Sequence, residues 1–63
     1  MNVKIKRLIN GLSQKELAAL VGTSNVTIVK IEKGNIESIK FGTLKKIAEV
    51  LGSSITELFL NEK

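Results

Sequence analysis

The chain of 63 residues contains no cysteine, histidine, tryptophan, tyrosine or proline. Without cysteine it can form neither a disulfide nor a thiolate metal site. Without histidine it lacks the side chain that most often serves as an acid or base near neutral pH and as a metal ligand. The six acidic side chains form no recognisable catalytic constellation. We therefore expect no enzymatic activity, no metal or other cofactor, and no small-molecule ligand.

Long hydrophobic runs are also absent. The N-terminal segment MNVKIKRLIN lacks the long apolar run of a signal peptide, and no segment is long and apolar enough to cross a membrane. We expect a cytoplasmic protein that does not contact membranes, folded as a single domain over residues 1–63. A chain this short is only marginally stable alone, so pairing of two copies would be a natural source of stability.

Positive charge exceeds negative charge, with ten Lys and Arg against six acidic residues and a net charge of +4. This excess suits an anionic partner such as nucleic acid, an acidic protein or an anionic membrane. A surface with surplus solvated lysines would give the same balance. We interpret Lys15, Lys45 and Lys46 as solvated charges of that kind, and Lys4 and Lys6 fit the same interpretation.

Apolar residues recur with helical spacing between the glycines. The predicted helices cover residues 2–10, 14–21, 24–33, 41–51 and a last segment from residue 54. The first is expected to bury Val3 or Ile5 together with Leu8, Ile9 and Leu12, and the fourth to bury Leu44, Ile47, Ala48 and Leu51. No segment alternates with period two for long enough to be a strand. The predicted fold class is all-α, a compact bundle of five short helices.

Serine residues mark the starts of three of these helices. Ser13 and Glu16 have the spacing of a capping box, as do Ser54 and Glu57. Ser24 is the predicted N-cap of the third helix.

The segment Gly-Thr-Ser at 22–24 leaves only three residues between two short helices. A turn this short forces the helices to cross steeply, as in a helix-turn-helix. Ala18 supplies the small side chain that such a crossing needs, and apolar residues on both helices can close the wedge beneath. These residues are Leu17, Val21, Ile28 and Ile31. The spacing alone also fits any corner of two helices.

The third helix has two different sides at 100° per residue. Ser24, Thr27, Ile28 and Ile31 fall on the side predicted to be buried, and Asn25, Val26, Val29, Lys30 and Lys33 fall on the other. The outer side has no acid, and it offers an amide, ammonium groups and small apolar groups. This composition suits base edges and thymine methyl groups in the major groove of DNA. A solvated face with two exposed valines is the alternative interpretation.

Residues 12–34, LSQKELAALVGTSNVTIVKIEKG, resemble the helix-turn-helix of the phage repressor and Cro (XRE-type) family. The matching features are Leu-Ser-Gln before Glu-Leu-Ala, Gly-x-Ser at the turn, Thr-Ile in the next helix, and Ile-Glu-x-Gly at its end. Residues 41–59 resemble the last two helices of the family. Thr23, Lys40 and Gly42 depart from its pattern. The resemblance implies a lambda-repressor-like domain that binds a double-stranded DNA operator.

The same resemblance implies roles for individual residues. It assigns a phosphate contact to Gln14, base contacts to the start of the third helix, and further DNA contacts to lysines. The base-contacting residues are Ser24, Asn25, Val26 and Thr27, and the lysines are Lys30, Lys33 and, by a weaker match, Lys40. It also implies an ion pair between Arg7 and Glu32. Ile39 and Leu60 have no obvious core position, so we expect them at a dimer surface.

The leading hypothesis is a sequence-specific transcriptional regulator, expected to be a repressor, that binds DNA as a homodimer. The alternative is an antitoxin-like or regulatory module whose main partner is a protein and whose DNA binding is secondary. The helix-turn-helix fold serves both functions.

Overall fold

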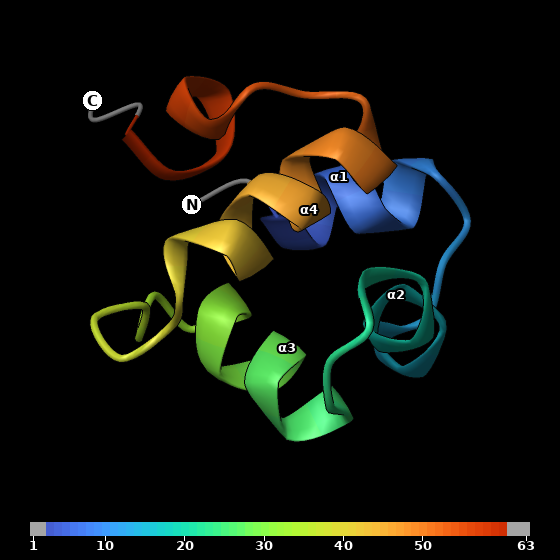
Figure 1. Cartoon of the computed structure of the whole chain (residues 1–63). Helices are drawn as coiled ribbons and strands as arrows, with labels where there is room; N and C mark the ends of the chain where they lie inside the picture. The colour runs from blue at the N-terminus through green and yellow to red at the C-terminus, as the bar shows by residue number, and fades with distance from the viewer. Residues whose placement is uncertain (1–2, 61–63) are drawn as a thin grey trace.

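The computed structural model describes residues 3–60 and, for Leu60, the backbone alone. In this range the chain forms α1 (Val3–Ile9), α2 (Gln14–Val21), α3 (Asn25–Glu32), α4 (Phe41–Leu51) and a single π-helical turn, η1 (Thr56–Leu60) (Figure 1). The described residues include no strand, and the predicted all-α class is confirmed. The predicted start of the first helix at Asn2 lies outside the described residues. The π-helical geometry of η1 was not predicted.

Both predicted capping boxes are present. Glu16 N–H donates to Ser13 Oγ at 3.0 Å, and Ser13 N–H donates to Glu16 Oε1 at 2.8 Å. Glu57 N–H donates to Ser54 Oγ at 3.1 Å, and Ser54 N–H donates to Glu57 Oε1 at 3.1 Å. These bonds satisfy amide groups that have no partner inside the helices. Lys40 stands at the N-cap of α4 and supplies no side-chain cap there.

The turn between α2 and α3 depends on Gly22. Its φ of +84° lies in the left-handed region, which residues with a side chain rarely adopt. In this conformation the amides of Gly22 and Thr23 both donate to Ala18 O at 2.9 Å. Ala18 itself is buried. Figure 1 shows α2 nearly end-on while α3 runs across the view, which is the predicted steep crossing.

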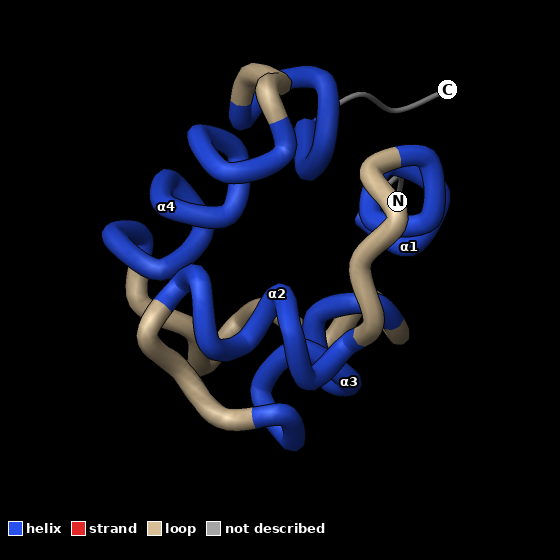
Figure 2. The backbone as a smooth tube through the Cα atoms, turned by 90° about the vertical axis from the view of Figure 1, so that its right-hand side faces the viewer, coloured by secondary structure: helices blue, strands red, loops and turns tan. Residues whose placement is uncertain are grey.

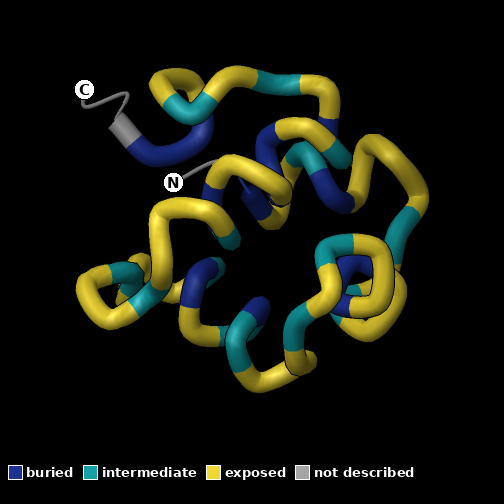
Figure 3. The backbone as a smooth tube through the Cα atoms, viewed as in Figure 1, coloured by how far each residue is buried: buried dark blue, intermediate teal, exposed yellow. Residues whose placement is uncertain are grey.

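The core is aliphatic except for Phe59, and every element contributes to it (Figure 3). α2 packs against α3 and α4, and α1 packs against α3 (Figure 2). The buried apolar residues are Val3, Leu17, Ala18, Ile28, Ile31, Leu44, Ile47, Ala48, Leu51, Leu58 and Phe59. The predicted core positions of α4 are therefore all buried. Val21, predicted to close the wedge, is half-buried and packs against this core.

The predicted core side of the first helix is correct for Val3, which was the alternative to Ile5, and wrong for Leu8 and Ile9. Ile5 and Leu8 are each 57% exposed and Ile9 is 74% exposed, whereas Val3 and Arg7 face the core. At about 100° per residue, Ile5 projects opposite to the side shared by Val3 and Arg7. Apolar residues thus occupy both sides of α1, and the side carrying Arg7 turns inward, where Glu32 is its partner. Leu12, just after α1, does pack against the core.

Ile39 also differs from expectation. It was predicted to lack a core position, but it is half-buried and packs against the core from the loop between α3 and α4. The side chain of Leu60, its predicted companion at a dimer surface, lies outside the described part of the chain.

Candidate nucleic-acid interface

The outer side of α3 carries polar side chains together with small apolar ones. Asn25 and Lys30 are exposed, and Val26 is 64% exposed. Val29 and Thr27 are half-buried. Ile28 and Ile31, on the opposite side of the helix, are fully buried and fix α3 against the core. Most of the predicted division of this helix is therefore present.

Ser24 departs from that division, because it was predicted on the buried side and is exposed. Ser24 precedes the first turn of α3, so the rotation of 100° per residue, which holds only within a helix, does not predict which side it faces. Its Oγ accepts from Thr27 N–H at 3.1 Å and lies 3.0 Å from the Thr27 hydroxyl oxygen. The predicted N-cap is present, and it fixes the first turn of the helix that carries Asn25 and Val26.

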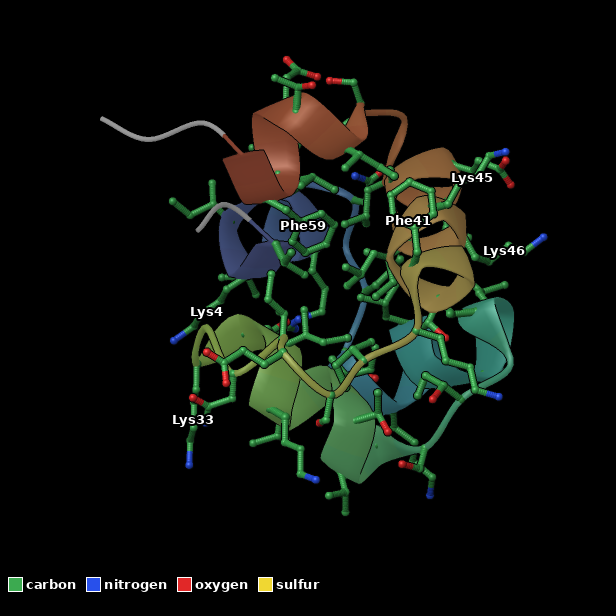
Figure 4. The ribbon with its side chains drawn as sticks, turned by 60° about the vertical axis from the view of Figure 1, so that its left-hand side comes forward. Lys4, Lys33, Phe41, Lys45, Lys46 and Phe59 are labelled. Carbon is green, nitrogen blue, oxygen red and sulfur yellow. The ribbon has the colours of Figure 1, made fainter. Side chains whose placement is uncertain are left out.

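The predicted DNA-contacting lysines are all exposed, and they lie at different elements. Lys30 is in the last turn of α3, Lys33 is its C-cap, and Lys40 precedes α4. In Figure 4, Lys33 extends outward on the same side as Lys4 of α1, whereas Lys45 and Lys46 extend from α4 on the other side of the view. The lysines of α4 are thus separated from the cations near the end of α3.

An ion pair joins α1 to the end of α3. Arg7 Nε donates to Glu32 Oε2 at 2.6 Å, and Arg7 Nη2 donates to Glu32 Oε1 at 3.3 Å. Arg7 Nη1 donates to the carbonyl oxygen of Leu12 at 2.8 Å. The two charged side chains are 7% and 6% exposed. The pair implied by the family resemblance is present, and the positive charge of Arg7 is directed into the fold.

The same carboxylate holds Gln14, the first residue of α2. Gln14 is half-buried, and its Nε2 donates to Glu32 Oε1 at 3.0 Å. No local sequence pattern indicates this contact, because the two residues are 18 positions apart. The proposed phosphate-binding residue is therefore also part of the network around Glu32.

The environment of Glu32 changes its acidity. Burial by itself acts to raise the pKa of Glu32. Hydrogen bonds from Arg7 and Gln14, together with the positive charges of Arg7 and Lys4, outweigh burial and hold the pKa of Glu32 below its usual value. Glu32 is thus an ionised carboxylate at neutral pH. The charge of Lys4, interpreted from the sequence as solvated, contributes to this environment.

Phe41 is an exposed residue that sequence reasoning left without a role. It opens α4 directly after the loop that contains Ile39, and it is 65% exposed. The sequence does contain a signal for it. Phe41 and Phe59 are the two aromatic residues of the chain, and of the two Phe59 has helical core spacing. An exposed aromatic side chain is a strong candidate for contact with another molecule.

Two features are absent from residues 3–60. No three acidic side chains in this range gather into a set that could hold a metal ion. No helix in the range combines the length and apolar character needed to cross a membrane.

A family model described as helix-turn-helix matches residues 3–58. The chain belongs to the helix-turn-helix family. The match confirms the resemblance to XRE-type proteins, since it includes the two crossing helices, the residues around Glu32, and α4.

The helix-turn-helix chain is also similar to two proteins of Methanocaldococcus jannaschii. One is an uncharacterized HTH-type transcriptional regulator, 38% identical over 61 residues that make up 95% of this chain and 89% of the relative. The other is glutamine–fructose-6-phosphate aminotransferase (isomerizing), 36% identical over 52 residues. That match includes 82% of this chain but spans only 5% of the aminotransferase. No solved structure matches the chain significantly.

Proposed function

We propose that the protein is a sequence-specific transcriptional regulator that inserts α3 into the major groove of double-stranded DNA. The exposed side of α3 carries this proposal. It holds Asn25, Val26 and Lys30 on a helix that is fixed by a capped start and a buried opposite side. The similarity to a protein named as an HTH-type transcriptional regulator supports the same function.

Contacts to phosphates position the helix, and contacts to base edges select the sequence. Gln14 at the start of α2, Lys33 at the end of α3 and Lys40 before α4 are the proposed phosphate-binding residues. The net charge of +4 favours binding to the phosphate backbone and makes this binding salt-dependent.

A regulator that occupies an operator blocks access to it, so we propose repression. We also propose that the protein acts in the cytoplasm.

We propose that two copies bind the operator together. A single module of this size covers little DNA, and two-fold operators place half-sites about one helical turn apart. The proposed dimer surface includes the exposed part of Ile39 and the ring of Phe41. The side chain of Leu60, also predicted there, lies outside the described part of the chain. Sedimentation should show a dimer on the operator, and Phe41→Asp should weaken it. A parent protein that stays monomeric both free and on its operator would exclude pairing.

A protein partner is the second candidate function, and one observation favours it. The exposed side of α1 carries Ile5, Leu8 and Ile9, a contiguous apolar strip that α3 does not use. An antitoxin-like or regulatory module could bind a protein there, with DNA binding secondary. We propose no enzymatic role for either candidate.

Selection of bound duplexes from a random pool, followed by a gel shift with the selected duplex, tests the proposed function. We expect one enriched sequence with two-fold symmetry, bound much more tightly than random duplex. We also expect binding to weaken as the salt concentration rises. Retention of no duplex at low salt would reject the proposal and leave the protein-binding candidate.

A further inference from the structure

The side-chain amide of Gln14 has two N–H groups, and only one of them is bound within the described structure. Its Nε2 donates to Glu32 Oε1 at 3.0 Å. A carboxylate only accepts hydrogen bonds, so this contact places the nitrogen of the amide, rather than its oxygen, towards Glu32. The two N–H groups of a planar amide diverge. When one is bound to Glu32, the direction of the other is fixed.

Glu32 is held in turn by Arg7. The guanidinium donates through Nε and Nη2 to both carboxylate oxygens, and through Nη1 to the carbonyl oxygen of Leu12 in the segment before α2. Both side chains of the pair are almost completely buried. The position of the carboxylate is therefore set by α1 and by the chain entering α2, and Glu32 cannot move without losing these bonds.

The charges in this network suit a neighbouring phosphate. A lone carboxylate beside Gln14 would repel an anion, but the bidentate contact with Arg7 compensates the charge of Glu32. Gln14 is half-buried at the first position of α2, so part of its side chain is accessible at the surface of the fold.

We propose that Glu32 is a positioning residue for DNA binding, which orients the Gln14 amide so that its second N–H donates to a phosphate oxygen. The inference rests on the proposed function, because it assumes that Gln14 meets DNA. Glu32 does not touch DNA itself. Arg7, whose three guanidinium nitrogens each donate a hydrogen bond inside the fold, acts through Glu32 and contributes no phosphate contact of its own.

A double-mutant cycle tests the coupling of the two side chains. The affinity for the selected duplex is measured for the parent, Gln14→Ala, Glu32→Gln and the double variant, each shown to be folded by circular dichroism at low temperature. Because Gln14→Ala loses one charge-assisted hydrogen bond to phosphate, it should bind the selected duplex about tenfold more weakly per half-site. Glu49→Gln, which removes an exposed carboxylate of α4, corrects for the change in net charge.

Relative to Glu49→Gln, Glu32→Gln should also lose about tenfold in affinity per half-site when Gln14 is present. In the Gln14→Ala background the same substitution should change affinity by less than about twofold, since Glu32 has nothing left to position. An equal loss in both backgrounds would show that Glu32 acts only through the general fold, and would overturn the proposal. A parent that binds no duplex would instead reject the proposed function, and the positioning role would fall with it.

A second measurement does not require the Glu32 variant to fold. In the free parent, one side-chain amide hydrogen of Gln14 should exchange with solvent at least about tenfold more slowly than those of exposed Asn25, because it is bound to Glu32. The Gln14 resonances are assigned by their loss in Gln14→Ala. If both hydrogens exchange as fast as those of Asn25, the amide is not held and the proposal is wrong.

Discussion

Arg7 Nε lies 2.6 Å from Glu32 Oε2, and the contact joins residues that are 25 positions apart in the chain. The pair connects α1 to the end of the helix that we propose reads DNA. A buried pair adds little net stability compared with an apolar replacement, but loss of one partner leaves the other charge without compensation.

Removing either member of this pair should therefore destabilise the protein strongly. We expect Arg7→Met and Glu32→Gln each to lower the free energy of unfolding by about 3 kcal/mol, measured by urea denaturation. The double variant should recover part of that loss, because no charge is then stranded. Lys46→Met, at an exposed position of α4, is the control and should change stability by no more than about 0.5 kcal/mol. Parent-like stability in both single variants would show that the pair does not form in solution.

The depressed pKa of Glu32 predicts a specific sensitivity to acid. Its pKa is lower in the folded chain than the usual 4.5, so the stabilisation is fully present above that value and is lost as the pH falls through the lower, folded pKa. The unfolding free energy of the parent should thus decrease as the pH drops below about 4.5. Glu32→Gln should show a shallower fall, and the exposed Glu49→Gln should follow the parent. Identical pH profiles for parent and Glu32→Gln would contradict this assignment.

The orientation of α1 can be tested with two matched truncations. Val3→Ala removes apolar volume from the core and should cost about 2 kcal/mol of unfolding free energy. Ile9→Ala removes a side chain that is 74% exposed and should change stability by less than about 0.5 kcal/mol. The reverse order would mean that α1 buries its other side, as its apolar spacing predicts.

The sequence predicted local features well, because their signals lie within a few residues. The capping boxes at Ser13 and Ser54, the N-cap at Ser24 and the turn at Gly22 each depend on adjacent backbone groups, and all are present. The bounds of α2 and the end of α4 at Gly52 follow from such signals. The family resemblance supplied the longer-range pairing of Arg7 with Glu32.

The sequence could not decide between the two sides of α1. Periodicity favoured Leu8 and Ile9 together with either Val3 or Ile5, whereas the fold buries Val3 with the charged residue Arg7. The deciding factor is the partner of Arg7 on α3, which no local pattern reveals. The contact between Gln14 and Glu32 was missed for the same reason, and Ile39 found a core contact across the loop.

Lys33 should contribute to DNA affinity without selecting a sequence. If a dimer neutralises about six phosphates, raising the salt concentration from 50 to 200 mM should weaken binding roughly a thousandfold. Lys33→Ala should reduce the slope of log affinity against log salt by about two per dimer, and weaken all duplexes alike. Lys46→Ala, on α4, should leave the slope unchanged. If the effect of Lys33→Ala is confined to one base position, Lys33 reads a base instead.

The base preferences of α3 follow from the chemistry of its exposed side chains. The amide of Asn25 can pair with both N6 and N7 of adenine, and Lys30 should prefer guanine, which offers two acceptors. Val26 makes no hydrogen bond and should pack against a thymine methyl group. Each such contact contributes roughly 1–3 kcal/mol of discrimination.

The central claim is that the exposed side of α3 reads the operator. The most direct measurement compares the affinities of the parent, Asn25→Ala and Val26→Ala for the selected operator and for its single-base variants, including thymine replaced by uracil. Asn25→Ala should lose discrimination at one symmetric pair of positions and keep the salt dependence of the parent. Uracil should weaken binding of the parent but hardly affect Val26→Ala. If both variants bind the operator as tightly and as selectively as the parent, α3 is not the element that reads DNA.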